Sequence, residues 1–217
     1  SAEAFQQSVE GAYYAKQFMQ LYAKGRIGTL PDNSHLPVNT AWDIGVGDST
    51  AIWFFRIVGT EYHVIDYYEN SGEGLRHYMK VLKDRGYTYG QHFAPHDMDN
   101  REFGSDAQSR SDIARKGYEI DGQRYGIAFK VLKRAPVDEG IEAARELLAH
   151  CAFDVDKCEK GLSCLENYRK EWDDDKGSWK DRPLHDWSSH GADAFRYFAQ
   201  AMSKPKPAFD TNLRMTL

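Results

Sequence analysis

Three β-rich segments follow one another with almost no chain between them. They cover residues 38–44 (VNTAWDI), 50–58 (TAIWFFRIV) and 61–68 (EYHVIDYY), and the short stretches GVGD and GT join them. Such short turns permit antiparallel pairing of neighbouring strands, whereas a parallel connection needs a dozen or more residues. The sequence therefore predicts an antiparallel meander at the centre of the fold.

Segments with helical periodicity alternate with further strand candidates along the rest of the chain. We expect helices at residues 8–25, 72–85, 107–117, 136–150, 157–171 and 189–202, and strands at 87–97 and 124–132. The segment 136–150 begins with proline and acidic residues, which are favoured in the first turn of a helix. This order of elements predicts a mixed α/β domain with helices packed on a sheet.

The chain length suits one large domain with short appendages, since 217 residues can bury a substantial core. We expect residues 1–36 to form a lead-in helix and linker, because LPDNSHLP interrupts the helical pattern with two prolines. Residues 37–204 are expected to form the main domain. Residues 205–217 have two spaced prolines and no periodicity, and are expected to be a flexible tail.

Composition and charge argue against several classes of protein. No apolar run approaches the length that crosses a bilayer, and no basic-then-apolar signal begins the chain, so a cytoplasmic location is expected. The three cysteines are too few for a disulfide framework, and their spacing does not fit a zinc knuckle. A net charge of −5 argues against bulk electrostatic coating of nucleic acid, but permits a basic groove around an acidic centre.

Three aspartates stand at unusual places in this pattern. Asp43 ends the first strand, Asp97 ends the strand predicted over 87–97, and Asp193 lies inside the small and apolar helical stretch GADAFRYF. An unpaired carboxylate in a half-buried strand is unfavourable, and aspartate is a poor residue for a helix interior. For Asp43 alone, a turn-forming role is a sufficient explanation. Together, the three acids could meet at one end of the sheet.

Carboxylates gathered in this way can bind two divalent cations. Oxygen ligands suit Mg²⁺ or Mn²⁺, and no tight cluster of Cys or His competes for the role. Two such ions stabilise the attacking and departing oxygens of a phosphoryl displacement. The leading prediction is therefore metal-dependent phosphodiester cleavage, with Asp43, Asp97 and Asp193 as catalytic and metal-binding residues.

Several strings of residues resemble one known family. WDIGVGDSTAIWFF, APHD and SHGADAFRYFA, in this order, are similar to motifs in the nuclease domain of tailed-bacteriophage large terminase subunits. GAYYAKQF and FDVDKCEKGLSCLENYRKEWD also resemble stretches of that family, so the resemblance covers roughly residues 8–202.

The resemblance implies a ribonuclease H-like fold and an endonuclease that cuts double-stranded DNA, the concatemeric phage genome, during packaging. It makes Asp43 the first-strand acid shared by two metals, Asp97 the second acid and Asp193 the third. It also implies three protein partners, namely the terminase ATPase domain, the small terminase subunit and the portal protein, in the host cytoplasm. Because the chain has no G-x-x-x-x-G-K-[ST] motif, we expect it to be the nuclease half only and not to hydrolyse ATP.

Accessory residues of the site can also be predicted. Glu69 and Asp66 lie near the end of the third strand, and strand alternation puts them on opposite faces, so at most one should reach the acids. His190 stands one helical turn before Asp193 and could orient it or assist the leaving group, although a surface or helix-start histidine is the commoner case. Weaker candidates are His96 and His185 for proton transfer, and Asp48 and Ser49 for contacts with a metal-bound water or the DNA backbone.

Basic residues are needed for a surface that binds DNA. We favour Lys130, Lys133 and Arg134, on a predicted strand and the loop after it, with Arg101 as a further candidate. Phosphate contacts require positive charge but little precision in spacing, so this is the least specific of the predictions.

Two other functions remain open from the sequence. A junction resolvase or integrase of the same superfamily would use the same acids and differ only in its preferred substrate. A non-catalytic docking module of the packaging motor would keep the fold without the chemistry. The absence of Mn²⁺-dependent nicking, together with no gain in heat stability on adding Mn²⁺, would favour the docking module.

Overall fold

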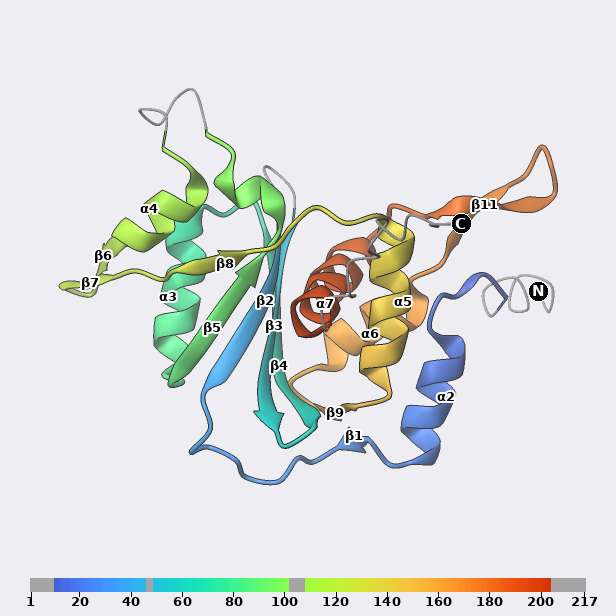
Figure 1. Ribbon diagram of the computed structural model, residues 1–217, viewed down its shortest axis with the longest axis horizontal. Helices are drawn as coiled ribbons and strands as arrows, with labels where there is room; N and C mark the ends of the chain where they lie inside the picture. Colours follow the sequence, from blue (N-terminus) through green and yellow to red (C-terminus); the bar gives the residue numbers. More distant parts are fainter. Residues whose placement is uncertain (1–9, 46–48, 102–107, 204–217) are drawn as a thin grey trace, which may run out of the picture.

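A mixed sheet forms the centre of the computed structural model, which describes residues 10–45, 49–101 and 108–203. The strand order is β1-β9-β4-β3-β2-β5-β8 (Figure 1). The strands are β1 (Ile27–Gly28), β2 (Val38–Ile44), β3 (Ser49–Val58), β4 (Glu61–Ser71), β5 (Tyr89–Ala94), β8 (Phe129–Val131) and β9 (Cys151–Asp154). Strands β2, β3 and β4 pair antiparallel, whereas β5, β8, β9 and β1 join in parallel. The predicted meander and mixed sheet are therefore confirmed.

Helices cover both faces of this sheet. They are α2 (Ala15–Ala23), α3 (Leu75–Arg85), α4 (Arg110–Lys116), α5 (Val137–Leu148), α6 (Glu159–Asn167) and α7 (Ser189–Met202). Figure 1 shows α3 and α4 on one side of the sheet and α5, α6 and α7 on the other. In the described residues, no helix has the length and apolar character required to span a membrane.

Alternating side chains of the meander fill two separate cores. Trp42 and Phe54 pack with the residues of α3, whereas Trp53 and Phe55 pack with α5, α6 and α7. Two contacts fix α7 on the sheet: the Trp53 Nε1 donates a hydrogen bond to the Gly191 carbonyl at 2.8 Å, and the rings of Phe55 and Phe198 stack with centroids 3.7 Å apart. The aromatic residues of the meander thus pack in the core, and α7 has a fixed position over β2 and β3.

The prediction for the strand over 87–97 was wrong at its end. Strand β5 stops at Ala94, because Pro95 has no backbone N–H for the ladder. Asp97 lies instead in a short 3-10 turn, η1 (His96–Asp99).

Other boundaries also differ from the predictions. The strand expected over 124–132 divides into β8 and β7 (Gln123–Tyr125), and β7 pairs with β6 (Tyr118–Ile120) in a separate hairpin. The helix expected over 157–171 ends at Asn167, and the antiparallel hairpin of β10 (Lys170–Asp173) and β11 (Ser178–Pro183) follows it. The residues of the predicted tail, 205–217, lie outside the described part of the chain.

Candidate active site

Two of the three aspartates lie at the same end of the sheet, where strands β2 and β5 finish. Strands β2 and β5 run parallel, with Ala41 paired to Phe93, so both strands terminate there. Asp43 is the sixth residue of β2, and Asp97 lies in the turn η1 that follows β5. Helix α7, which carries Asp193, packs across β2, β3 and β5. The fold therefore delivers all three acids to one region.

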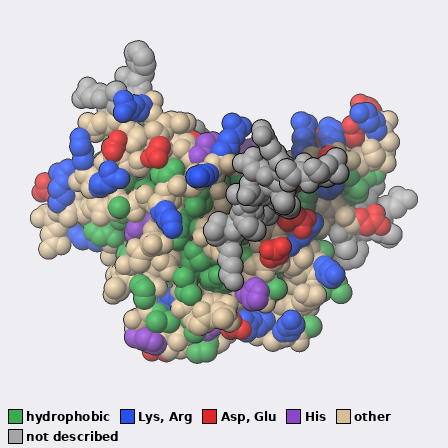
Figure 2. All heavy atoms as spheres, viewed as in Figure 1, with side chains coloured by type: hydrophobic (Ala, Val, Ile, Leu, Met, Phe, Trp, Pro, Cys, Tyr) green, Lys and Arg blue, Asp and Glu red, His purple; other side chains and the backbone are tan. Residues whose placement is uncertain are grey.

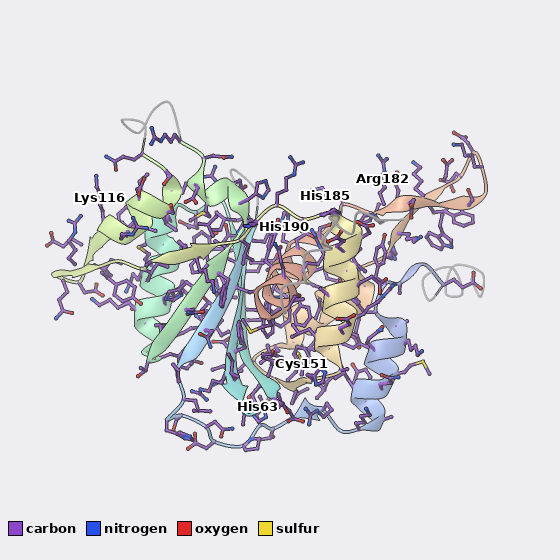
Figure 3. The ribbon with its side chains drawn as sticks, in the orientation of Figure 1. His63, Lys116, Cys151, Arg182, His185 and His190 are labelled. Carbon is purple, nitrogen blue, oxygen red and sulfur yellow. The ribbon has the colours of Figure 1, made fainter. Side chains whose placement is uncertain are left out.

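Asp43 contacts the first turn of α7. The His190 Nδ1 lies 3.3 Å from the Asp43 Oδ2, and the His190 ring meets the His185 ring with centroids 5.7 Å apart (Figure 3). Burial raises the pKa of Asp43, and the negative charge of Asp193 raises it further, while the contact with His190 opposes both effects. Asp43 and Asp193 are therefore close enough to repel each other when both are ionised.

Asp193 is bound by two groups that the sequence analysis did not identify. Its Oδ1 accepts hydrogen bonds from the Arg196 Nη2 at 2.7 Å and Nε at 3.1 Å, and from the Tyr168 hydroxyl at 3.4 Å. Arg196 is only 9% exposed, and its side chain fits against Gly140 of α5, where a Cβ atom would lie 3.3 Å from its Nη1. The spacing of three residues between Asp193 and Arg196 on one helix is a feature that could have indicated this pair.

The pKa of Tyr197 is affected by all three acids. Its pKa is raised to about 12, first by burial and then by the negative charges of Asp43, Asp193 and Asp97, while Arg196 opposes the shift. A single phenol therefore lies within electrostatic range of the three carboxylates.

Asp97 has a buried carboxylate oxygen that is available to bind a cation. Its Oδ1 is buried and has no hydrogen-bond partner in the described part of the chain. A buried carboxylate oxygen without a donor is unfavourable unless a cation or water satisfies it. Among the residues described, no three His, Cys, Asp or Glu side chains already form a metal-binding group. The donor chemistry of the three acids nevertheless suits a hard divalent ion.

Glu69 and Asp66 lie on opposite faces of the sheet. Ala51 of β3 is paired with Asp43 on one side and with Glu69 on the other, so Glu69 shares the face of Asp43 two strands away. Its carboxylate accepts a hydrogen bond from the Tyr67 hydroxyl at 2.5 Å and lies 3.4 Å from the Lys160 Nζ.

Asp66 faces α3 instead. It pairs with the Arg85 Nε at 2.5 Å and accepts a hydrogen bond from the backbone N–H of Tyr67. The structure does not bring Asp66 to the three acids, because its position in β4 directs it to the α3 face.

Two predicted basic residues line a cavity together with Arg196, the partner of Asp193. A cavity of about 660 Å³ is lined by His96, Lys133, Arg134, Arg196 and Tyr197, among others. The Gln200 side chain of α7 donates a hydrogen bond to the Lys133 carbonyl and so holds this loop against the helix. Lys133 and Arg134 are both exposed and line this cavity.

The remaining candidates are more scattered. The Lys130 Nζ lies over the Phe93 ring, 5.6 Å from its centroid. Arg101 is exposed and forms an isolated β-bridge with Ser109, next to residues outside the described ranges. Ser49 begins β3, and Asp48 lies outside the described residues. Figure 2 shows lysine and arginine side chains spread along the upper edge of the molecule rather than in one compact patch.

Cys151 lies away from the three acids, whereas Cys164 packs against the first turn of α7, where a Cβ atom on Gly191 would lie 3.0 Å from its Sγ. All three are buried free thiols, and burial raises the pKa of Cys151. In Figure 3, Cys151 and His63 lie near the end of the sheet opposite His190. Within the described ranges nothing groups them into a metal site.

An antiparallel meander, parallel strands on both of its sides and helices on both faces define a ribonuclease H-like fold. This fold is shared with nuclease domains of phage large terminases of known structure, at low sequence identity. A large terminase from a thermophilic bacteriophage, in complex with ATP-γ-S, superposes with a TM-score of 0.60 and 18% identity, covering 87% of this chain and 45% of that one.

Isolated nuclease domains are matched over more of their length. The large terminase nuclease domain of bacteriophage SPP1 with bound Mn gives a TM-score of 0.52 and 16% identity, over 79% of this chain and 92% of that one. The large terminase nuclease of thermophilic phage G20c with bound magnesium gives a TM-score of 0.51 and 15% identity, covering 88% of this chain and 97% of that one.

The similarity is structural. No family model matches the sequence, and no curated protein matches it. The chain spans less than half the length of the terminase that binds ATP-γ-S. The predicted resemblance is thus confirmed at the level of the fold.

Proposed function

We propose that this chain is the nuclease domain of a large terminase subunit and that it cuts double-stranded DNA, the concatemeric genome of a phage, during packaging. The fold it shares with the SPP1 and G20c nuclease domains supports this assignment. The observation that carries it is geometric: Asp43 contacts His190 in the first turn of α7, Asp193 lies three residues further along this helix, and Asp97 follows β5, the strand parallel to β2.

Asp43, Asp97 and Asp193 are the proposed ligands of two divalent cations, Mg²⁺ or Mn²⁺. When bound, such ions supply the positive charge that stabilises the attacking and leaving oxygens of an in-line phosphodiester displacement. The chain's own residues prepare the ligands: His190 orients Asp43, and Arg196 fixes the rotamer of Asp193 through its Oδ1. The bound Mn and magnesium of the SPP1 and G20c structures support the choice of metal.

The cavity beside the acids is the proposed path of the DNA backbone. His96, Lys133 and Arg134 line it, and the two basic residues are exposed. Lys130 and Arg101 would extend the positive surface. Because phosphate contacts carry no sequence code, we expect little base specificity.

The proposed partners follow from the longer neighbours. One of these large terminases is in complex with ATP-γ-S, whereas this sequence has no phosphate-binding loop. We therefore propose that an ATPase domain supplies the motor. The resemblance to large terminases further implies a small terminase subunit and a portal protein, which would control cleavage in the host cytoplasm.

A plasmid-cutting assay tests the proposal. We expect the purified chain to convert supercoiled plasmid to nicked and linear forms with Mn²⁺ or Mg²⁺. The Asp43→Asn variant should lose about 100-fold or more of this rate, since a ligand of both ions is altered.

The matched control is Asp84→Asn, which removes an exposed acid paired with Lys80 on α3 and should cut at the wild-type rate. Circular dichroism should show the native fold in both variants. Equal cutting by wild type and Asp43→Asn would reject the active site, and preferential cutting of four-way junctions over plasmid would support a resolvase instead.

A further inference from the structure

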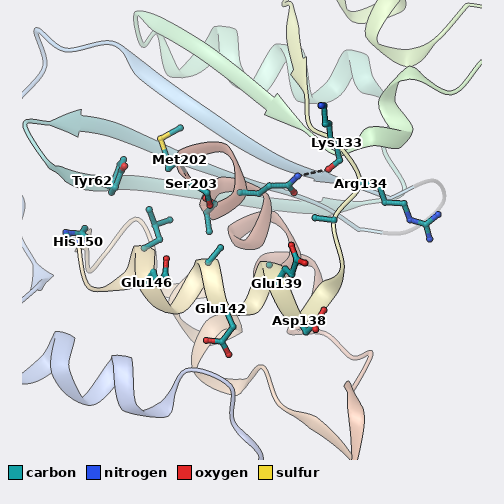
Figure 4. Close-up of a pocket in the computed structure, with 16 residues that line it drawn as sticks. Tyr62, Lys133, Arg134, Asp138, Glu139, Glu142, Glu146, His150, Met202 and Ser203 are labelled. Carbon is teal, nitrogen blue, oxygen red and sulfur yellow. Dashed lines mark hydrogen bonds between the residues drawn. The ribbon is translucent and has the colours of Figure 1, made fainter. Parts of the chain in front are cut away.

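A second groove lies between α5 and α7; it shares Lys133, Arg134 and Gln200 with the cavity described above, and none of the three acids lines it. Its volume is about 920 Å³, and Figure 4 shows the residues that line it. Apolar groups form its floor, from Tyr62, Ala143, Leu147, Ala199 and Met202. An apolar floor of this kind is suited to bind aliphatic or aromatic side chains.

Acidic side chains line the α5 wall of this groove. They are Asp138, Glu139, Glu142 and Glu146, and all four belong to α5. Glu142 pairs with Arg145. The other three form no ion pair with any residue in the described ranges. Three carboxylates of this wall are therefore outside any ion pair of the described residues, although Lys133 and Arg134 also line the groove.

The chain itself leaves α7 at this groove. Ser203, which follows the last residue of α7, is one of the groove residues. Its backbone N–H and its hydroxyl both donate hydrogen bonds to the Ala199 carbonyl, at 2.9 and 2.8 Å. The chain therefore leaves Ser203 at the groove.

The segment 204–217 has a composition complementary to the groove. Its sequence, KPKPAFDTNLRMTL, has the basic residues Lys204, Lys206 and Arg214, one acid, and the apolar residues Phe209, Leu213, Met215 and Leu217. Fourteen extended residues can span up to about 46 Å, whereas the twelve residues of α5 are about 18 Å long. The segment is therefore long enough to follow the whole groove.

We propose that residues 204–217 bind in the groove between α5 and α7 of the same chain. Lys204 and Lys206 pair with Glu146 and Glu142 on α5, and the apolar residues that follow cover the floor. This intramolecular site does not depend on the proposed nuclease activity, since none of the three acids lines the groove.

Carbodiimide cross-linking of the full chain tests the site. Equal amounts of ¹⁵N-labelled and unlabelled protein are treated, and amide links between lysine and carboxylate side chains are identified by mass spectrometry. We expect links from Lys204 or Lys206 to Glu142 or Glu146 within one chain. The Lys180–Glu171 pair, at 2.6 Å, is the internal positive control. Links from Lys204 or Lys206 that form only between labelled and unlabelled chains would assign the groove to a second copy and overturn the proposal. The proposal would also be overturned if Lys180 and Glu171 are linked but neither Lys204 nor Lys206 is linked to α5.

Trypsin cleavage after Arg214 gives a second measurement. In the double variant Glu142→Lys/Glu146→Lys, the bound state should be lost and the cleavage rate should rise about threefold or more, because cleavage follows the population of the open form. The control Glu119→Lys/Asp174→Lys reverses two exposed acids outside the groove and should be cut at the wild-type rate. Equal rates in all three proteins would overturn the proposal.

Discussion

His190 of α7 contacts Asp43 of β2, with its Nδ1 3.3 Å from the Asp43 Oδ2, although 147 residues separate them in the chain. The contact joins the first turn of the closing helix to the end of the first meander strand. Burial and the charge of Asp193 raise the pKa of Asp43, so its ionised form is unfavourable in the metal-free protein. Several measurable consequences follow from this arrangement.

The variant Asp43→Asn should be more heat-stable than the wild type at neutral pH without metal. A carboxyl whose pKa is raised in the folded state favours folding below its unfolded pKa, and this contribution is lost as pH rises through the folded pKa. The difference in melting temperature should therefore grow as pH rises above the ordinary carboxyl range, near 4. Thermal melts of both proteins from pH 4 to pH 8 in EDTA measure it.

The same melts with Mn²⁺ provide the control. The ion should raise the melting temperature of the wild type and leave Asp43→Asn nearly unchanged, since ligand binding stabilises only the protein that binds. If the melting temperature of the wild type rises relative to that of the variant from pH 4 to pH 8 in EDTA, ionised Asp43 does not destabilise the metal-free protein, and the prediction is contradicted.

Loss of Arg196 should destabilise the site. In Arg196→Met, the half-buried Asp193 loses its partner, and breaking such a pair costs about 3 kcal/mol. Urea denaturation measures the change in the free energy of unfolding. The control Arg182→Met breaks an exposed pair with Glu171 and should leave the free energy of unfolding close to the wild-type value. Equal losses in the two variants would show that Arg196 does not hold Asp193.

His92 makes stability dependent on pH in another part of the sheet. Burial lowers its pKa to about 4, and its Nδ1 lies 2.7 Å from the Thr40 hydroxyl oxygen. A histidine with a lowered pKa contributes stability above its unfolded pKa near 6.5, and this is lost as pH falls towards 4. The loss should be on the order of 3 kcal/mol.

Urea denaturation between pH 7 and pH 4 measures this loss. The variant His92→Gln, which cannot titrate, should show a flatter profile than the wild type over this range. The exposed His35→Gln should keep the wild-type slope. A wild-type slope in His92→Gln would assign the pH dependence to other groups.

Gly161 allows α6 to approach the sheet closely. A Cβ atom at this position would lie 2.4 Å from the Trp53 Cη2 and 2.7 Å from the Tyr67 Cγ, both in the core. Gly161→Ala should therefore cost about 1–3 kcal/mol of unfolding free energy. At Gly28, no atom lies within 4 Å of the added Cβ, so Gly28→Ala is the matched control and should be near neutral in urea denaturation. Similar stability of the two variants would contradict the close packing.

The sequence predicted the meander because its pattern is local. Strand β2 has the predicted bounds, 38–44, since an apolar run with short turns leaves few alternatives. Strand β9 (Cys151–Asp154) was missed, because its four residues follow a helix directly and their partners in β4 are distant in the sequence. Parallel pairing of this kind leaves no local pattern.

The candidate site was partly predictable for a related reason. Acids at strand ends and inside an apolar helix are visible as departures from a local rule. Arg196 was missed because a basic residue in a helix usually faces solvent, and only packing against Gly140 reveals its burial. The distribution of the basic residues depends on loop geometry, which the sequence does not specify.

The most direct test of the account is a crystal structure of the protein with Mn²⁺, using anomalous scattering to locate the ions. The account predicts anomalous density for two ions about 3.5–4 Å apart between Asp43, Asp97 and Asp193. Asp97 should then bind through the buried Oδ1 that has no hydrogen-bond partner among the described residues. Saturating Mn²⁺ with no density between these three carboxylates would contradict the proposed active site.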